Sequence, residues 1–190
     1  MDYTNIKCCK EEIDGLICRL FLKKEGEKPL ILIGLNPSTA DETTSDATMR
    51  KILGFIEKWD ERTTHHFDSF IMLNLYPLIE TSPAVLNARH EFNPLLHSRN
   101  LAIITMFLEK YSRAEVLLCY GDSIETVKWL KGCRDEILKL LAHYKDITVF
   151  TLGKMTNMKN PRHPCRLSYS TNPEPFSNPF HFRTEIKSKE

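Results

Sequence analysis

The feature that most constrains the fold is the run Leu30–Leu35, which contains only apolar residues and one glycine. A continuously apolar strand is typical of a sheet that is buried on both faces, and such sheets consist of parallel strands covered by helices. Between residues 29 and 152, similar runs alternate with segments of helical periodicity. This pattern predicts a three-layer α/β/α sandwich with a central four-stranded parallel sheet, connected by right-handed crossovers.

The predicted elements alternate along the chain. The four strands are expected at Leu30–Leu35, Phe67–Asn74, Glu115–Tyr120 and Ile147–Leu152, after an edge strand at Leu16–Lys23. Helices are expected around residues 49–59, within Leu95–Tyr111, and from Asp122 to about His143. Ser45 or Asp46 is placed to cap the first helix, and Asp122 with Glu125 has the spacing of a capping box for the third.

The length of 190 residues fits one domain. We expect its core at about residues 16–168, followed by a proline-rich tail at 169–190 that wraps over the surface. No apolar run approaches the roughly 18–20 residues of a membrane span, and the N-terminus lacks the basic and apolar regions of a signal peptide. We therefore expect no membrane contact and a cytoplasmic location.

Charge and cysteine spacing exclude several classes of protein. With 26 basic and 25 acidic residues, the net charge of +1 gives no global attraction to nucleic acid. An excess of bases after residue 153 suits either a phosphate contact or a solvated tail. The six cysteines show no C-x-x-C pair, so we expect free thiols, no metal site and no cofactor.

Polar residues follow the predicted strands where each apolar run stops. Asn36 follows the first strand, Asn74 ends the second, Tyr120 ends the third, and His163 follows the fourth. Because ligands of α/β sheets bind beyond the carboxyl ends of the strands, these side chains are expected at one site. An amide offers both a donor and an acceptor, which suits the edge of a nucleobase. The alternative is that the asparagines and the histidine are ordinary loop residues.

Further candidates lie in the loops that follow the first and last strands. Ser38 and Thr39 are placed to line the site or to pin the first loop. Arg162 and Arg166 offer guanidinium groups to phosphates, while Leu167 is either exposed at the site or packed in the ordinary way.

Four short motifs look like the signature of a bacterial and phage family catalogued as domain of unknown function 1643. They are residues 34–41 (GLNPSTAD), 46–50 (DATMR), 74–75 (NL) and 161–164 (PRHP). That family name assigns no chemistry.

More distantly, residues 29–168 resemble the uracil-DNA glycosylase superfamily, which has a sheet of four parallel strands with active-site residues at the strand ends. Residues 34–37 (GLNP) are similar to its G-I-N-P-G motif, 72–74 (MLN) to L-L-L-N, 120–121 (YG) to W-G, and 163–168 (HPCRLS) to H-P-S-P-L-S. The sequence departs from that pattern after the first motif, where the polar stretch 39–45 replaces an aromatic segment that would stack a flipped base.

The resemblance implies a role for each candidate. Asn36 would orient water, Asn74 would read the base edge, and His163 would donate to a base carbonyl. The remaining roles are base or ligand binding for Gly34, Pro37, Ser38, Thr39 and Tyr120, phosphate or DNA binding for Arg162 and Arg166, and a wedge that fills the gap left by a flipped base for Leu167.

The expected function is therefore a nucleobase or nucleotide site like that of uracil-DNA glycosylase, with DNA base excision as the reaction and DNA or a nucleotide as the partner. One alternative is a module that binds nucleic acid or a nucleotide without cleaving it. Another is a metal-dependent nucleotide hydrolase, in which Asp41 and Asp46 gather a magnesium ion. Magnesium dependence separates the hydrolase from a glycosylase, because base excision needs no metal.

Overall fold

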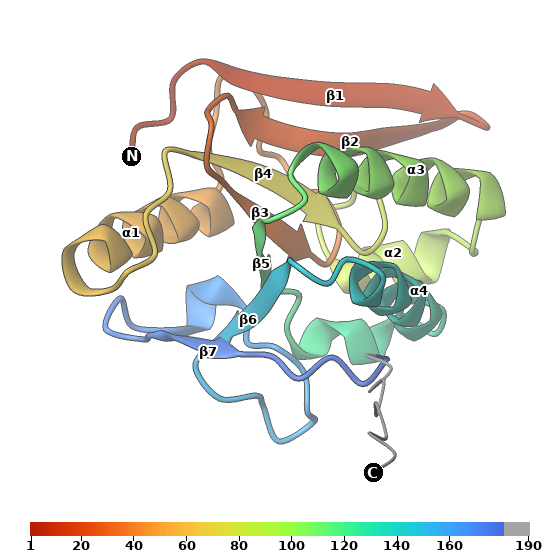
Figure 1. Cartoon of the computed structure of the whole chain (residues 1–190). Helices are drawn as coiled ribbons and strands as arrows, with labels where there is room; N and C mark the ends of the chain where they lie inside the picture. Colours follow the sequence, from red (N-terminus) through yellow and green to blue (C-terminus); the bar gives the residue numbers. More distant parts are fainter. Residues whose placement is uncertain (181–190) are drawn as a thin grey trace, which may run out of the picture.

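One mixed sheet organises the chain in the computed structural model, which describes residues 1–180 (Figure 1). Its strand order is β1-β2-β4-β3-β5-β6-β7. The strands are β1 (Ile6–Ile13), β2 (Leu16–Lys24), β3 (Pro29–Gly34), β4 (Ser69–Asn74), β5 (Glu115–Leu118), β6 (Thr148–Leu152) and β7 (Pro173–Pro175).

The centre of the sheet is parallel and its edges are antiparallel. β3 pairs in parallel with β4 and β5, and β5 pairs in parallel with β6. β1 and β2 form an antiparallel hairpin that joins through β4, and β7 joins antiparallel to β6. The sheet thus has seven strands where the sequence predicted four parallel strands and one edge strand. β1 and β7 were not predicted, because the alternating pattern of β1 and the short β7 carry no continuous apolar run.

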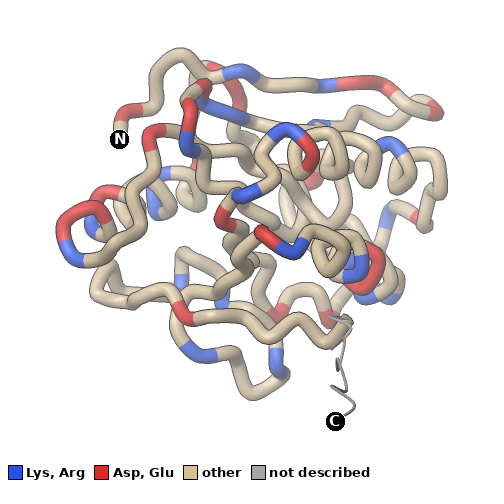
Figure 2. The backbone as a smooth tube through the Cα atoms, viewed as in Figure 1, with Lys and Arg blue, Asp and Glu red and all other residues tan. Residues whose placement is uncertain are grey.

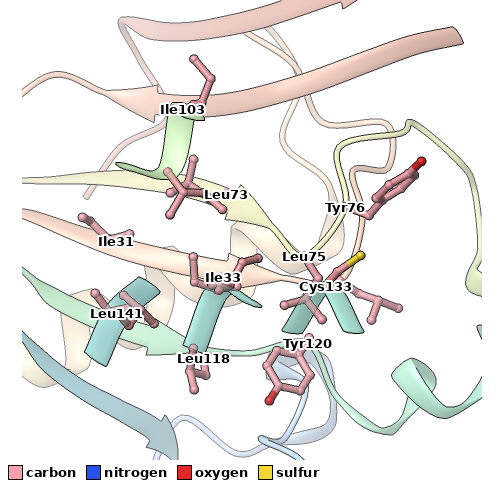
Figure 3. Packing of buried hydrophobic residues seen from close by; sticks show 14 of the residues in the cluster. Ile31, Ile33, Leu73, Leu75, Tyr76, Ile103, Leu118, Tyr120, Cys133 and Leu141 are labelled. Atoms are coloured by element: carbon pink, nitrogen blue, oxygen red, sulfur yellow. The ribbon is translucent and has the colours of Figure 1, made fainter. Parts of the chain in front are cut away.

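Helices cover both faces of this sheet. They are α1 (Ala47–Arg62), α2 (Pro83–Arg89), α3 (Pro94–Lys110) and α4 (Leu130–Ala142). Alternation along β3 sends Leu30 and Leu32 into a cluster with α1. Ile31 and Ile33 enter the opposite cluster, which α3 and α4 cover (Figure 3). This second cluster includes the ring of Tyr120.

Two features near the N-terminus refine the predicted elements. Asp46 is the cap of α1, since its Oδ1 accepts a hydrogen bond of 2.8 Å from the backbone N of Met49. β2 is not an edge strand, because the hairpin places β1 outside it (Figure 1). The register of the hairpin shifts between Cys9 and Lys10.

The predicted third helix is replaced by two shorter elements. Asp122–Thr126 form a 3₁₀ helix, η1, and the α-helix begins only at Leu130. Asp122 and Glu125 do not make a capping box, because their carboxylates accept hydrogen bonds from Asn160 Nδ2 at 3.0 and 3.1 Å. These two acidic residues therefore bind the loop that contains Asn160, and they do not form the predicted helix cap.

The predicted tail takes part in the sheet. Its prolines form β7, and Phe176 N donates to the carbonyl of Val149 at 2.9 Å. Residues 181–190 of the predicted tail lie outside the described residues. Within residues 1–180, no helix combines the length and apolar character that crossing a membrane requires.

Candidate functional site

A cavity of about 770 Å³ opens beyond the carboxyl ends of β3 and β5. The chain passes from β3 to β4 on one side and later enters β5 on the other, so the sheet has a topological switch point here. Ligands of open α/β sheets bind at such points, and the volume lies in the range of small-ligand sites. The sheet order therefore accounts for the location of the cavity.

The cavity gathers most of the predicted site residues but not all of them. Those that line it are Gly34, Asn36, Ser38, Tyr120, Arg162, His163 and Arg166, and those that do not are Pro37, Thr39, Asn74 and Leu167.

His163 lies in the cavity wall as a half-buried side chain. The backbone N of Cys165 donates to His163 Nδ1 at 3.3 Å, at the start of the short 3₁₀ helix η2 (Pro164–Arg166). Burial lowers the pKa of His163 below its ordinary value of 6.5; Arg166 adds to this effect, and Asp46 opposes it. The imidazole is therefore neutral at pH 7, with its proton on Nε2, which makes that nitrogen a hydrogen-bond donor.

Gly121 allows the His163 loop to approach β5. Its φ of +71° lies in the left-handed region, and its N donates to Pro161 O at 3.0 Å. A Cβ at this position would lie 2.9 Å from the Cβ of His163. Glycine after Tyr120 is thus needed for the position of the imidazole.

Asn160 fixes the other end of the same loop. Its side chain is 1% exposed and donates to Asp122 and Glu125, and Thr156 Oγ1 also donates to Asp122 at 2.6 Å. Sequence reasoning missed Asn160 and Thr156. The signal that could have found them is the acidic pair itself, once its role as a capping box is rejected.

Asn36 is largely committed to its own loop. Its Nδ2 donates to the carbonyls of Pro37 and Glu80, both at 3.0 Å. These bonds join the loop after β3 to the segment before α2, which is the structural role that the alternative interpretation predicted. Oδ1 accepts no hydrogen bond within residues 1–180, so only an acceptor is left for a ligand or a water.

Asn74 lies just behind the cavity wall. It is 1% exposed, and neither its Nδ2 nor its Oδ1 has a hydrogen-bond partner within residues 1–180. A Cβ on Gly34 would lie 2.9 Å from Asn74 Oδ1 and 2.5 Å from Met72 Cε. Both Gly34 and Met72 line the cavity, so the amide lies next to the cavity wall. A buried unpaired amide costs about 1–3 kcal/mol, so Asn74 is a destabilising side chain beside the site.

The other predicted residues lie outside the cavity wall or pack in the hydrophobic clusters. Pro37 is buried and Thr39 is exposed, both outside the cavity wall. Leu167 packs against the cluster beneath α1 and is not an exposed wedge. The ring of Tyr120 belongs to the cluster beneath α4 (Figure 3), and burial raises its pKa.

Arg19 is a cavity residue that sequence reasoning missed. It comes from β2, is 2% exposed and lines the cavity. Its Nη1 donates to Ala40 O at 2.6 Å, but Nε has no partner in the described chain. Burial lowers its pKa, yet an arginine remains protonated at neutral pH. Within residues 1–180 no carboxylate oxygen lies within 4.0 Å of its guanidinium.

The charged groups of the cavity are paired unequally. Each carboxylate that lines it already accepts hydrogen bonds: Asp46 from Met49 N, Glu80 from His90, and Asp122 from Thr156 and Asn160. Arg162 donates to Lys154 O, and no arginine of the cavity pairs with a carboxylate of the described chain. Lysines and arginines without acids also mark residues 154–166, the loop after β6 (Figure 2). Three arginines (Arg19, Arg162 and Arg166) and three carboxylates (Asp46, Glu80 and Asp122) therefore line the cavity without pairing directly with one another.

The two aspartates of the predicted magnesium site serve the loop before α1. Asp41 Oδ1 accepts from the backbone N of Thr43 and Thr44, while Asp46 caps α1. Across residues 1–180, no group of three or more His, Cys, Asp or Glu side chains is placed to hold a metal ion.

Comparison with protein families gives one match. The model of the family described as "Protein of unknown function (DUF1643)" matches residues 19–165. The chain belongs to this family. Neither the curated proteins nor the solved structures gave a match. The DUF1643 region begins at Arg19 and ends at Cys165, so it includes both the missed arginine and the His163 loop.

Proposed function

We propose that the cavity is a nucleobase site of the uracil-DNA glycosylase kind, at which the protein hydrolyses the N-glycosidic bond of a nucleotide. The likeness to that superfamily's fold is part of the proposal. The observation that carries it is the place of His163, a half-buried imidazole in the cavity wall whose Nδ1 accepts a hydrogen bond from Cys165 N, which leaves Nε2 as the donor. A neutral donor of this kind suits a carbonyl oxygen on which negative charge develops.

The reaction would place that charge on the departing base. Water adds to the sugar C1′, the bond from C1′ to the base nitrogen breaks, and the base leaves with the electron pair while the water proton passes to solvent. In such a reaction the sugar becomes positively charged and the base carbonyl negatively charged in the transition state. His163 Nε2–H would stabilise the carbonyl, and Asn36 Oδ1 would accept a hydrogen bond from the attacking water.

Asn74 would hold the edge of the base. Its donor and acceptor are both unused within the described chain, and a nucleobase edge offers the complementary pair. The flexible side chain of Met72 would have to turn aside for the base to reach the amide. Arg162 and Arg166, exposed at the cavity rim, would contact phosphate. Leu167 has no role in the proposal, because it packs against the core.

The direct test is base release. Purified protein is incubated, with and without EDTA, with single- and double-stranded oligonucleotides that contain uracil, hypoxanthine, xanthine or a T·G mismatch, and alkali then reveals abasic sites as strand breaks. We expect breaks that survive EDTA and are lost in His163→Ala. His143→Ala is the matched control, because His143 is exposed at the end of α4 and bonds only Lys139 O. No break with any oligonucleotide, and no base released from free nucleotides, would contradict the proposal.

One observation favours a second candidate, binding without cleavage. The carboxylates that line the cavity are all engaged by other groups, so none is free to activate water. Tight binding of a nucleotide with no release of base would distinguish this function from hydrolysis.

A further inference from the structure

We propose that Arg19 forms an anion subsite in the cavity and that the ligand is a free nucleotide whose phosphate group binds there. This inference deepens the proposed function and rests on it for the nucleobase site, whereas the anion subsite can be tested by itself. Arg19 lies outside the motifs at residues 34–41, 46–50, 74–75 and 161–164.

The first argument is the state of the guanidinium. Arg19 is 2% exposed, it lines the cavity, and its Nε donates to nothing in the described chain. A buried charge is costly unless a counter-charge and hydrogen bonds compensate it. Asp46 and Asp41 are near enough for their charges to act on Arg19. No carboxylate of residues 1–180 lies within 4.0 Å of the guanidinium, however, so an anionic group of a ligand can be its direct partner.

The second argument is the neighbouring end of α1. Asp46, Thr48 and Met49, at the start of this helix, line the same cavity as Arg19. The first N–H groups of a helix have no partner inside it and favour anions. Of these groups, Met49 N is taken by Asp46, while the backbone N–H groups of Ala47 and Thr48 have no acceptor in the described chain. The Asp46 carboxylate is engaged in this cap and does not pair with Arg19.

The burial of Arg19 limits the size of the ligand that can reach it. A guanidinium that is 2% exposed is reached only by a group that enters the cavity. The backbone phosphates of a duplex lie outside, where the exposed Arg162 and Arg166 are placed to meet them. A single phosphate on a mononucleotide can enter together with its base, so the position of Arg19 favours the free nucleotide over DNA.

The experiment compares four probes by calorimetry at fixed salt: a nucleoside, its 5′-monophosphate, inorganic phosphate, and the same nucleotide within a single-stranded oligonucleotide. We expect the monophosphate to bind at least about tenfold more tightly than the nucleoside, since a hydrogen bond to a charged group is typically worth that much. Inorganic phosphate should compete with the monophosphate.

Three variants test whether Arg19 is responsible for the tighter binding of the monophosphate. Arg19→Met should lose the advantage of the monophosphate while still binding the nucleoside, and phosphate should no longer raise its melting temperature. Arg19→Lys should retain part of the advantage, because lysine keeps the positive charge but lacks the planar guanidinium with its several donors. Arg50→Met is the matched control, because Arg50 is exposed on the first turn of α1 and does not line the cavity, and its replacement removes the same charge.

Equal binding of nucleoside and monophosphate by the wild-type protein would overturn the inference, and this result does not depend on any variant folding. An unchanged phosphate advantage in Arg19→Met would also overturn it, as would a preference for the oligonucleotide. The two proposals fail separately. Arg19-dependent phosphate binding without nucleoside binding would remove the nucleobase site and keep the anion subsite, whereas nucleoside binding without a phosphate effect would do the reverse.

Discussion

The two walls of the cavity differ in how they are built and in the charge they present. The His163 wall is a loop held by hydrogen bonds from its own Asn160 to Asp122 and Glu125 and by the close approach to Gly121, and it presents a neutral donor. The Arg19 wall belongs to the antiparallel hairpin and presents a permanent charge with few bonds. A positioned neutral donor suits a developing charge, whereas a fixed cation suits an anion that is already present.

The largest expected effect is the loss of catalysis when His163 is replaced. His163→Ala should lower the rate of base release about 10²–10³-fold, as the loss of an oxyanion donor typically does. Quantified strand cleavage under single-turnover conditions measures this rate. Its melting temperature should stay close to that of the wild type, because only the hydrogen bond to Cys165 N is lost. A rate within twofold of wild type would remove His163 from the mechanism.

The next prediction compares two buried asparagines behind the cavity. Asn74→Leu should raise the free energy of unfolding by about 1 kcal/mol, because an unpaired amide is replaced by an apolar group of similar size, while nucleoside binding should be lost. Asn100→Leu should lower it by about 1–3 kcal/mol, since Asn100 Nδ2 donates to the carbonyls of Asn74 and Leu75.

Urea unfolding of both asparagine variants, together with calorimetric titration of a nucleoside, measures these effects. Destabilisation of both proteins by the same amount would show that Asn74 has a partner or a packing role like that of Asn100.

A pair of glycines sharpens the role of the loop in the His163 wall. Gly121→Ala should destabilise the protein by about 1–2 kcal/mol from its left-handed backbone alone, and the contact with His163 Cβ should displace the imidazole. Gly132→Ala, within α4 and with nothing within 4 Å of the new Cβ, should stabilise by about 0.5–1 kcal/mol. Thermal unfolding of both variants and the base-release assay test this contrast, which equal melting temperatures would contradict.

The smallest expected effect is on the pH dependence of stability. It arises from His163, which titrates, and not from Arg19, which stays charged. The pKa of His163 is lowered in the folded state, so the unfolded chain takes up its proton first as the pH falls. His163 therefore contributes a loss of stability that begins near its unfolded pKa of about 6.5 and is absent above it. Proton NMR of the imidazole should show a midpoint below 6.5, and His163→Gln should remove this part of the pH dependence. A midpoint above 6.5 would contradict the lowered pKa of His163.

The sequence predicts those site residues that stand out in the local pattern of the chain. Gly34, Asn36 and Asn74 stand at the ends of apolar runs, and the PRHP motif stands out in its loop, so the sequence pattern is enough to place these residues at one edge of the sheet. Arg19 lies in an alternating strand, where a charged residue ordinarily faces solvent. Its burial depends on the distant loop that contains Ala40, whose carbonyl accepts a hydrogen bond from the guanidinium.

The sequence alone predicted parallel strands at the centre of the sheet, because strands that are apolar on both faces are stable only when helices cover them. The order of the strands came from the structure. The sequence also determined that polar residues gather beyond the ends of these strands. The tertiary structure decided which of those residues remain available to a ligand: Asn36 gives its donors to the backbone, the half-buried Leu167 packs against the core, and Asn74 keeps both polar atoms unpaired within residues 1–180. Hydrogen bonding and burial depend on neighbours that are distant in the chain, and only the fold brings those neighbours together.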